Sequence, residues 1–270
     1  MISIKKIGFI GGGNMGEALI KGLIEGAFPA ADILVAEPVE DRRQQLIERY
    51  GIDARADAAE VVAASEVVVL AIKPQIVPLV MPAIAKALDQ SKLLVSIAAG
   101  VTSQTLENYL SGSPRVIRVM PNTPALVGAG ATAICRGSHA SEEDLLMARQ
   151  LFEAVGIVRI VSEGQMDAVT GLSGSGPAYV YTVIEAMAAG GVQQGLTMDV
   201  ALALAAQTVF GAAKLVMESG EHPALLRDKV CSPGGTTIEA VKTLEKKGLR
   251  AALMEAVSRA AQRSQELGRK

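Results

Sequence analysis

Residues 231–239 combine the residue types that could hold a small anion and place a hydroxyl beside it. They read Cys-Ser-Pro-Gly-Gly-Thr-Thr-Ile-Glu. Thr236 and Glu239 have the spacing of a capping box, which predicts a helix beginning at Thr237. The first N–H groups of such a helix favour a carboxylate or phosphate. An ordinary capped turn between two helices would fit the segment equally well.

The glycines and hydroxyls of this segment define a candidate substrate site. Gly234 and Gly235 let the backbone approach a ligand because they carry no Cβ. Ser232 and Thr237 add hydroxyl groups on either side, which can donate or accept a hydrogen bond. The predicted substrate-binding residues are Ser232, Gly234, Gly235, Thr236 and Thr237.

A glycine motif near the start of the chain indicates a dinucleotide site. Gly11, Gly13 and Gly16 directly follow the apolar run 4–10 and open a segment of helical character. In this strand-turn-helix context the first glycine permits a tight turn, the second lets backbone reach a pyrophosphate, and the third lets the helix pack closely. We predict a nicotinamide or flavin dinucleotide held by Gly11, Gly13, Asn14, Met15 and Gly16.

An acidic residue, Glu37, ends the second predicted strand, about 20 residues past the glycine motif. An acidic side chain at this position accepts a hydrogen bond from the ribose 2′-hydroxyl of NAD. Arg42 and Arg43 lie one helical turn farther on, where they could face the 2′-phosphate of NADP or simply be solvated helix charges. The sequence therefore leaves both NADH and NADPH open as the cofactor.

Three further strand ends supply candidate cofactor contacts, since ligands bind at the carboxyl edge of such a sheet. Lys73 follows a buried strand, where it could contact the cofactor or only cap the sheet edge. Asn122 lies in a loop stiffened by two prolines and could bond the nicotinamide carboxamide. The small residue Ala99 suits close passage of a flat ring. The predicted set is Ala71, Ile72, Lys73, Pro74, Ala99 and Asn122.

Strand and helix patterns alternate over roughly the first 160 residues. The predicted strands are 4–10, 33–36, 67–72, 93–97, 115–120 and 157–161, with helices such as 75–88 and 103–110 between them. These units predict an α/β fold with an N-terminal Rossmann-type, doubly wound parallel sheet. From Ser162, which has Gln165 as a capping partner, the pattern predicts only helices: 163–192, 198–219, a short one after Pro223, 237–247 and 249–267. We therefore expect a dinucleotide-binding domain over 1–162 and an all-α C-terminal dimerisation and substrate domain over 163–270.

The helical half contains a segment that a single chain can hardly bury. Residues 200–216 are apolar nearly all round, interrupted only by Gln207, Thr208, Gly211 and Lys214. A helix of that kind must be covered on every side. We infer a homodimer formed through the helical half.

Charge and composition argue against several classes of partner. The 270 residues carry a formal net charge of −2, so no basic field attracts nucleic acid or anionic lipid. Aromatic residues make up 3% of the chain, which disfavours recognition of bases by stacking. The two cysteines lack a C-x-x-C spacing, so we expect no metal site and a reducing compartment. No apolar signal segment precedes the glycine motif and the charge-free windows are broken by Pro and Gly, so we expect a cytoplasmic protein without membrane contact.

The chain offers few acids or bases for catalysis. Its only histidines, His139 and His222, stand beside predicted helix starts, and no Ser-His-Asp arrangement can be assembled. Reduction of a cationic C=N bond needs a hydride and one hydrogen-bonding group near nitrogen. It depends less on a strong acid than the reduction of a ketone does. Thr237, beside an anion-binding turn, would serve a small substrate that carries both an imine and a carboxylate.

Five blocks along the chain together resemble the signature of the Δ1-pyrroline-5-carboxylate reductase family. They cover 9–16, 71–74, 118–124, 171–179 and 223–245, and they come in the family's order. The resemblance implies hydride transfer from NADPH or NADH to the imine carbon of 1-pyrroline-5-carboxylate, giving L-proline in the last step of proline biosynthesis. It also implies a homodimer, often within a ring of dimers.

The resemblance assigns roles to the 232–237 loop as well. It implies that this loop holds the substrate carboxylate, that Thr237 is the catalytic residue and bonds the imine nitrogen, and that the site forms between subunits. Many family members have a small or polar residue at the end of the second strand and favour NADPH. Glu37 departs from that pattern, so the cofactor preference stays open.

Two other functions remain as alternatives. A β-hydroxyacid dehydrogenase would share the Gly-x-Gly-Asn-Met-Gly entry, but Val180 stands where such an enzyme has a lysine after the glycine pair. A dinucleotide-binding sensor without catalysis would have no need of a second anion site, which the 234–237 loop would supply.

Overall fold

The computed structural model describes residues 4–268, which fall into two compact units. One unit contains the chain up to Ser175 together with the residues from Arg259 onward, and the other is Gly176–Ser258. The division into domains over 1–162 and 163–270 stays a prediction.

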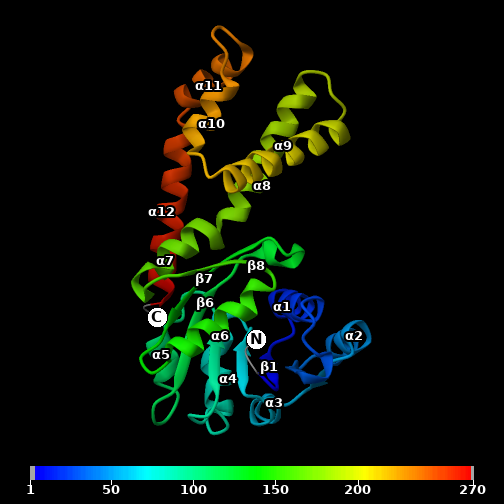
Figure 1. Cartoon of the computed structure of the whole chain (residues 1–270), viewed down its shortest axis with the longest axis vertical. Helices are drawn as coiled ribbons and strands as arrows, with labels where there is room; N and C mark the ends of the chain where they lie inside the picture. Colours follow the sequence, from blue (N-terminus) through cyan, green and yellow to red (C-terminus); the bar gives the residue numbers. More distant parts are fainter. Residues whose placement is uncertain (1–3, 269–270) are drawn as a thin grey trace. The chain divides into compact units, whose positions relative to one another are not determined.

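The first unit is built on an eight-stranded sheet in the order β3-β2-β1-β4-β5-β6-β7-β8 (Figure 1). The strands are β1 Ile7–Ile10, β2 Ile33–Ala36, β3 Asp53–Arg55, β4 Val67–Leu70, β5 Leu93–Ser96, β6 Arg115–Met120, β7 Gly130–Arg136 and β8 Gly156–Ile160. Strands β1 to β6 are parallel, β7 is antiparallel to β6, and β8 is parallel to β7. The predicted α/β fold with a mostly parallel sheet is confirmed. The strand β7, which the hydrophobic pattern does not predict, and the strand β8 run opposite to β1–β6.

The reversal at β7 follows from the chain that precedes it. Residues 121–129 hold only the 3₁₀ turn Thr123–Val127, whereas a parallel return needs a crossover of about a dozen residues or more. Strands β7 and β8 are parallel because the helix α6, Glu142–Glu153, provides such a crossover. The hydrophobic pattern misses β3 because this three-residue strand is short and charged at both ends.

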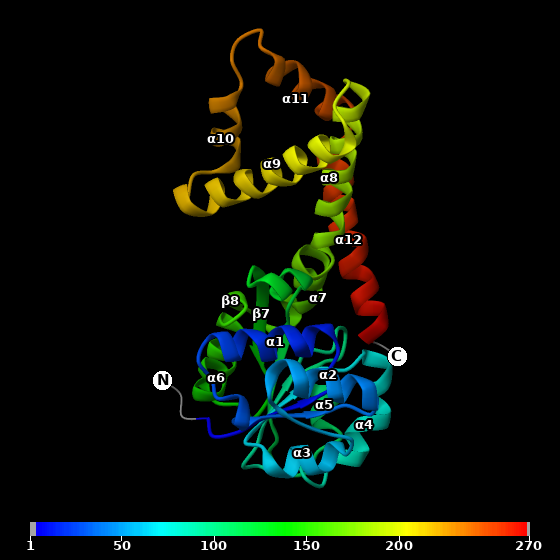
Figure 2. The same ribbon diagram turned by 90° about the vertical axis from the view of Figure 1, so that its right-hand side faces the viewer.

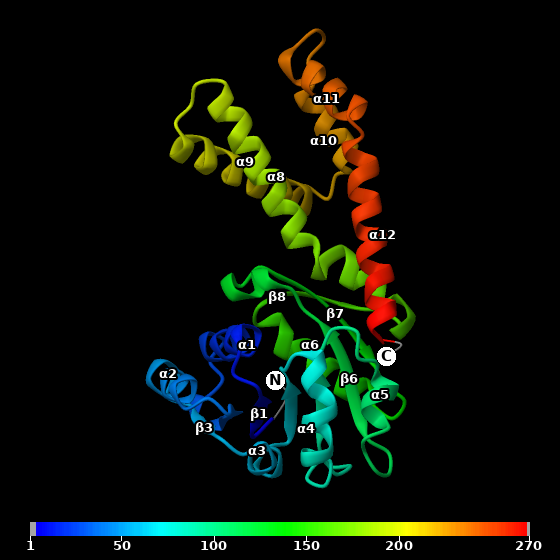
Figure 3. The same cartoon turned by 180° about the vertical axis from the view of Figure 1, so that it is seen from behind.

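Helices cover both faces of this sheet, as Figures 1 and 3 show from opposite sides. One layer consists of α1 Asn14–Glu25, α2 Glu40–Tyr50 and α6, packed around buried strand residues such as Phe9 and Val35. The other consists of α3 Ala58–Ala64, α4 Val77–Ile84 and α5 Ser103–Glu107, packed around residues such as Val68 and Leu94. The central strands are apolar on both faces for this reason.

The long helix predicted over 163–192 is broken into four pieces. They are a 3₁₀ turn Glu163–Gln165, α7 Met166–Val169, a π-helix Thr170–Gly174 and α8 Gly176–Gln193. Ser162 and Gln165 form the predicted capping box at the start. The π-helix coincides with the glycine-rich motif that begins at Gly171, and such turns are frequent at functional sites.

The second unit is helical throughout its described elements. After α8 it contains α9 Met198–Ser219, α10 Pro223–Val230, α11 Thr236–Lys246 and the first part of α12 Leu249–Gly268. Figure 2 shows α9 crossing α8, and Ala188, Ala201 and Ala205 form their contact. His222 caps α10, since its Nδ1 accepts the N–H of Ala224 at 3.2 Å, and this confirms its predicted capping position.

Helix α9 leaves most of its apolar surface uncovered in a single chain. Its buried residues are Ala201 and Ala205, while Leu204 is 57% and Phe210 59% exposed. Of the helices in residues 4–268, it is the one that is long and apolar enough to cross a bilayer by length and composition alone, with a mean hydropathy of 1.7. An exposed apolar surface of this kind marks an interaction site.

Candidate active site

The three glycines of the nucleotide motif meet the predicted steric demands. Gly11 has a φ of +103°, and a Cβ there would lie 2.5 Å from the carbonyl oxygen of Ala71. A Cβ on Gly16 would lie 2.6 Å from the carbonyl oxygen of Gly11, so helix and strand approach too closely for any side chain. A Cβ on the exposed Gly13 would meet nothing within 4 Å, which leaves its backbone open to a ligand.

The N-terminus of α1 is open because its N-cap residue is Gly13 and no side chain caps it. The amides of Asn14, Met15 and Gly16 occupy the first turn, where backbone N–H groups lack partners within the helix. This arrangement, together with the helix dipole, fits the pyrophosphate of a dinucleotide.

Glu37 stands at the end of β2 and bonds the backbone of the glycine motif. Its Oε2 accepts the N–H of Gly12 at 3.0 Å, and its Oε1 accepts the N–H of Val39 at 3.1 Å. A carboxylate oxygen has capacity for a further hydrogen bond, so Glu37 can still accept one from a ribose hydroxyl.

Arg42 and Arg43 contact protein groups around the same strand end. Nε of Arg42 donates to the carbonyl oxygen of Gly12 at 2.8 Å. Nη1 of Arg43 donates to the carbonyl oxygens of Glu37 and Pro38 at 2.8 and 2.9 Å. The bond from Arg42 to the glycine motif is a contact that residue spacing does not reveal, because spacing shows only that Arg42 lies nearby.

The other predicted cofactor residues follow strands β4, β5 and β6 at their carboxyl ends. Ala71 and Ile72 are half-buried, and Lys73 is exposed just before the 3₁₀ turn that starts at Pro74. Ala99 is half-buried in the turn after β5. Because these strands and β1 are parallel, all of these residues lie at the same edge of the sheet as the glycine motif.

Asn122, predicted to bond the nicotinamide carboxamide, already holds two backbone segments together. Its Nδ2 donates to the carbonyl oxygen of Ser173 at 3.0 Å, and its Oδ1 accepts the N–H of Ala131 at 2.8 Å. The side chain therefore ties the loop after β6 to the π-helix and to β7. Its contact with a cofactor stays a prediction.

The 232–237 loop begins with a tight turn. The N–H of Gly235 donates to the carbonyl oxygen of Ser232 at 3.0 Å. Pro233 takes the second position and Gly234 the third, where its φ of +67° is one that residues with a Cβ avoid. The adjacent glycine is also required, since a Cβ on Gly235 would lie 2.2 Å from Oγ of Ser232.

The predicted capping box in this loop is wrong. The turn closes at Gly235, which becomes the N-cap, so α11 begins at Thr236, one residue earlier than expected. Glu239 is then too far along the helix to reach back to the cap, and its carboxylate pairs with Nζ of Lys242 at 3.3 Å. No side chain caps this helix.

The uncapped start of α11 makes the predicted anion site more favourable. The amides of Thr236, Thr237 and Ile238 form its first turn and lack partners within the helix. Thr237 is half-buried, while Ser232 and Gly234 are exposed. Backbone donors, a helix dipole and a hydroxyl therefore come together in this loop.

A buried polar cluster in the first unit was not anticipated by the motifs. Nη1 of Arg118, which is 4% exposed, pairs with Oε1 of Glu163 at 2.8 Å. Glu163 also accepts from the N–H of Ser103 at 3.1 Å and from its hydroxyl. Burial alone would raise the pKa of Glu163, but the bonds from Ser103 and Arg118 outweigh it and lower the pKa. The sequence contains one signal for this cluster, an arginine within an apolar strand, since a buried charge requires a partner.

The environment of Cys135, the cysteine of the first unit, does not suggest a nucleophile. Burial, and then the neighbouring carboxylate of Glu163, raise the pKa of Cys135 to about 12. Its thiol therefore stays protonated at neutral pH. Within residues 4–268, no group of three or more His, Cys, Asp or Glu side chains is placed to hold a metal ion.

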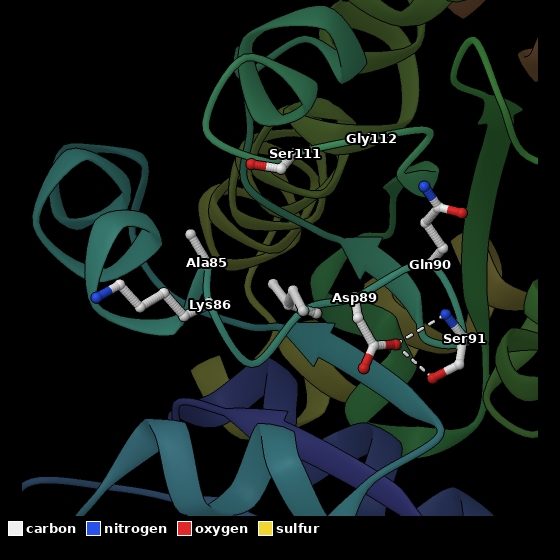
Figure 4. A pocket seen from close by; sticks show the side chains of 8 residues that line it. Ala85, Lys86, Asp89, Gln90, Ser91, Ser111 and Gly112 are labelled. Atoms are coloured by element: carbon white, nitrogen blue, oxygen red, sulfur yellow. Dashed lines mark hydrogen bonds between the residues drawn. The ribbon is translucent and has the colours of Figure 1, made fainter.

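A surface hollow lies at the opposite edge of the sheet, between the loops that precede β5 and β6 (Figure 4). Its polar lining includes Asp89, whose carboxylate accepts the N–H of Ser91 at 2.8 Å and also the Ser91 hydroxyl. Asp89 thus stabilises its own turn. Ligands of doubly wound sheets bind at the carboxyl ends of the strands, so this hollow is not a candidate active site.

Comparison with known proteins bears on both units. Residues 163–267 match the family model for pyrroline-5-carboxylate reductase dimerisation, and residues 6–100 match that for coenzyme F420-dependent NADP oxidoreductase. A pyrroline-5-carboxylate reductase of Methanosarcina acetivorans is 48% identical over 98% of this chain and 99% of its own.

Two solved structures are similar over nearly the whole chain. The pyrroline-5-carboxylate reductase of Coxiella burnetii has a TM-score of 0.92 and 37% identity, covering 97% of this chain and 98% of its own. The pyrroline carboxylate reductase of Plasmodium falciparum, solved with NADP bound, has a TM-score of 0.89 and 32% identity, with 99% of each chain covered. The chain belongs to the pyrroline-5-carboxylate reductase family.

Proposed function

We propose that this chain catalyses the reduction of 1-pyrroline-5-carboxylate to L-proline with NADPH or NADH, the last step of proline biosynthesis. The observation that carries the proposal is the uncapped, glycine-bounded start of α11 with Thr237 in its first turn, within a chain of this family. A dinucleotide-binding sensor would have no use for that second site, and a β-hydroxyacid dehydrogenase would need an additional acid.

The glycine motif and the adjoining strand ends would hold the cofactor. Gly11, Gly13, Asn14, Met15 and Gly16 would bind the pyrophosphate, and Glu37 the adenosine ribose. The residues proposed nearer the nicotinamide are Ala71, Ile72, Lys73, Pro74, Ala99 and Asn122. When bound, the cofactor supplies a hydride to the imine carbon.

The 232–237 loop would orient the substrate. Amides at the start of α11 and the backbone of Gly234 and Gly235 would bind the carboxylate, with Ser232 and Thr236 beside them. The hydroxyl of Thr237 would hydrogen-bond the ring nitrogen of the cationic imine, whose positive charge is neutralised as hydride adds to carbon and the C=N bond becomes C–N. Holding that nitrogen in place aligns the imine carbon for hydride transfer.

The assembly that we propose is a homodimer formed through the helical half, within a ring of dimers and in the cytoplasm. The matched family model for residues 163–267 is described as a dimerisation model, and α9 exposes the apolar residues that a second copy would cover. The active site would then form between subunits.

Replacing both Leu204 and Phe210 in α9 by Asp is expected to convert the oligomer into monomers, because two charges cannot be buried unpaired in the interface. Sedimentation velocity of the double variant measures this directly. The matched control is Leu79→Asp on α4, a side chain that is 73% exposed in the first unit, and it should keep the wild-type sedimentation coefficient. An unchanged oligomer in the α9 variant would contradict the proposed interface.

The proposed reaction is tested by following NADH and NADPH oxidation with 1-pyrroline-5-carboxylate, and with a panel of small hydroxy acids and NAD(P)⁺ in the reverse direction. We expect rapid cofactor oxidation with the imine, L-proline as the product, and little activity on the hydroxy acids. Activity on hydroxy acids alone would establish the dehydrogenase instead. Nucleotide binding without turnover of any compound would support the sensor.

A further inference from the structure

The peptide group of Gly12, inside the glycine motif, is held on both sides by the second strand-helix unit. Its N–H donates to Oε2 of Glu37 at 3.0 Å, and its carbonyl oxygen accepts from Nε of Arg42 at 2.8 Å. Gly12 is buried, and a Cβ there would lie 2.6 Å from Cδ1 of Leu46. The glycine motif, the acidic residue and the first turn of α2 therefore form one connected structure.

The remaining nitrogens of Arg42 also have partners. Nη2 pairs with Oε2 of Glu17 at 2.5 Å, and Nη1 donates to Oε1 of Gln45 at 3.3 Å. The other oxygen of Glu17 accepts from Arg49 and Tyr50 at 2.6 and 2.8 Å. Turning Arg42 toward a phosphate would break its bond to the glycine motif and remove a charged partner from Glu17, which makes that movement costly.

Arg43 is committed to backbone in a similar way. Its Nη1 bonds the carbonyl oxygens of Glu37 and Pro38, at the end of β2. The carboxylate of Glu37 is bonded by neutral amides, those of Gly12 and Val39, and across residues 4–268 no ion pair reaches it. The ribose end of the nucleotide site therefore presents the carboxylate of Glu37, while Arg42 is paired with Glu17 and Arg43 is bonded through Nη1 to backbone carbonyl oxygens.

We propose that this arrangement makes the chain prefer NADH to NADPH, with Glu37 as the specificity-determining residue and Arg42 as the positioning residue that joins the acid to the glycine motif. The inference rests on the proposed oxidoreductase function and selects one of its two cofactors. A ribose 2′-hydroxyl can donate to the Glu37 carboxylate. A 2′-phosphate would bring a charge of about −2 against that carboxylate, while Arg42 is paired with Glu17 and Arg43 is bonded to the backbone carbonyls of Glu37 and Pro38.

The preference for NADH over NADPH is tested by isothermal titration calorimetry of the wild-type protein with each nucleotide, in the absence of any imine. We expect NADH to bind at least about tenfold more tightly, since unscreened like charges at this range are worth more than a tenfold change in Kd. Equal binding of the two nucleotides, or tighter binding of NADPH, would overturn the proposal.

Glu37→Gln isolates the charge, because the amide keeps an oxygen that can accept the Gly12 N–H. The ratio of the two Kd values is expected to fall to within about threefold of unity as the like-charge repulsion disappears. The matched control is Glu40→Gln, an exposed carboxylate at the start of the same helix, which should retain the wild-type ratio. A similar shift in both variants would mean that the general field of α2, and not Glu37, sets the preference.

Arg42→Ala and Arg43→Ala distinguish positioning from phosphate recognition. Arg42→Ala should weaken the binding of NADH and of NADPH by a similar factor, about tenfold. The reason is that the glycine motif loses a charge-assisted hydrogen bond that holds it in place. Arg43→Ala should leave the ratio of Kd values unchanged. Titrating well below each variant's melting temperature separates a local change in the loop from unfolding. A selective loss of NADPH binding in either variant would show that the arginine reads the 2′-phosphate, contrary to the proposal.

The binding assay also separates this inference from the proposed reaction. A protein that reduces 1-pyrroline-5-carboxylate but binds both nucleotides alike refutes the preference and leaves the reaction intact. A protein that selects NADH but does not reduce the imine refutes the reaction and leaves the nucleotide selection intact.

Discussion

A Thr237→Ala enzyme is expected to turn over about 10²-fold more slowly than the wild type, the loss typical of removing one preorganised donor from a transition state. Thr237 lies in the first turn of α11, half-buried beside the Ser232–Gly235 turn. Its hydroxyl is proposed to bond the substrate nitrogen, whose positive charge is neutralised by hydride addition to the imine carbon. Steady-state kinetics with saturating cofactor and 1-pyrroline-5-carboxylate measures the effect, which should appear mainly in kcat.

The neighbouring Thr236 provides a matched control for this experiment. Thr236→Ala removes a hydroxyl of the same kind from the same turn, and Thr236 is more exposed than Thr237. It should raise KM several-fold at most, while Thr237→Ser should recover much of the lost turnover because it restores the hydroxyl. Wild-type kcat in Thr237→Ala, with an unchanged melting temperature, would remove Thr237 from the proposed mechanism.

Glu163→Ala is expected to lower the free energy of unfolding by about 3 kcal/mol, the lower end of the cost of breaking a buried ion pair. The side chain of Arg118 is 5% exposed and that of Glu163 32% exposed, so the substitution strands a buried guanidinium. It also removes the acceptor of two bonds from Ser103. Denaturant unfolding of the variant, followed by circular dichroism, measures the change.

An exposed ion pair serves as the control for Glu163. Arg136 and Glu142 pair at 3.1 Å, with side chains that are 43% and 70% exposed. Glu142→Ala should cost less than about 1 kcal/mol, because surface pairs contribute little. Equal losses in Glu142→Ala and Glu163→Ala would show that burial of the Arg118 pair does not matter for stability.

The Glu163 pair also predicts a direction for the pH dependence of stability. The folded-state pKa of Glu163 lies below its ordinary value, so the ionised carboxylate stabilises the fold above that ordinary value. This contribution is lost as the pH falls below the ordinary glutamate value and through the lowered folded pKa. Melting temperatures of Glu163→Gln should therefore fall less steeply than those of the wild type over that range.

The amino-acid sequence by itself determined the features that depend on local chemistry. The glycine motif at 11–16 requires backbone positions free of Cβ, and β1, β2 and β4 are short apolar runs with turns on either side. Ser162 and Gln165 form the cap that their spacing predicts. The motifs along the chain also identified the family, because each block needs its own residues at fixed separations.

Only the tertiary structure decided how segments distant in sequence meet. The short connection after β6 reverses β7, and the turn at Gly235 moves the start of α11 to Thr236 and leaves it uncapped. Arg42 could be a phosphate ligand or a solvated charge by sequence, but its contact with Gly12 joins residues 30 positions apart. Arg118 meets Glu163 across 45 positions. Such contacts depend on the packing of the whole sheet and its helices, and residue spacing along the chain does not contain that information.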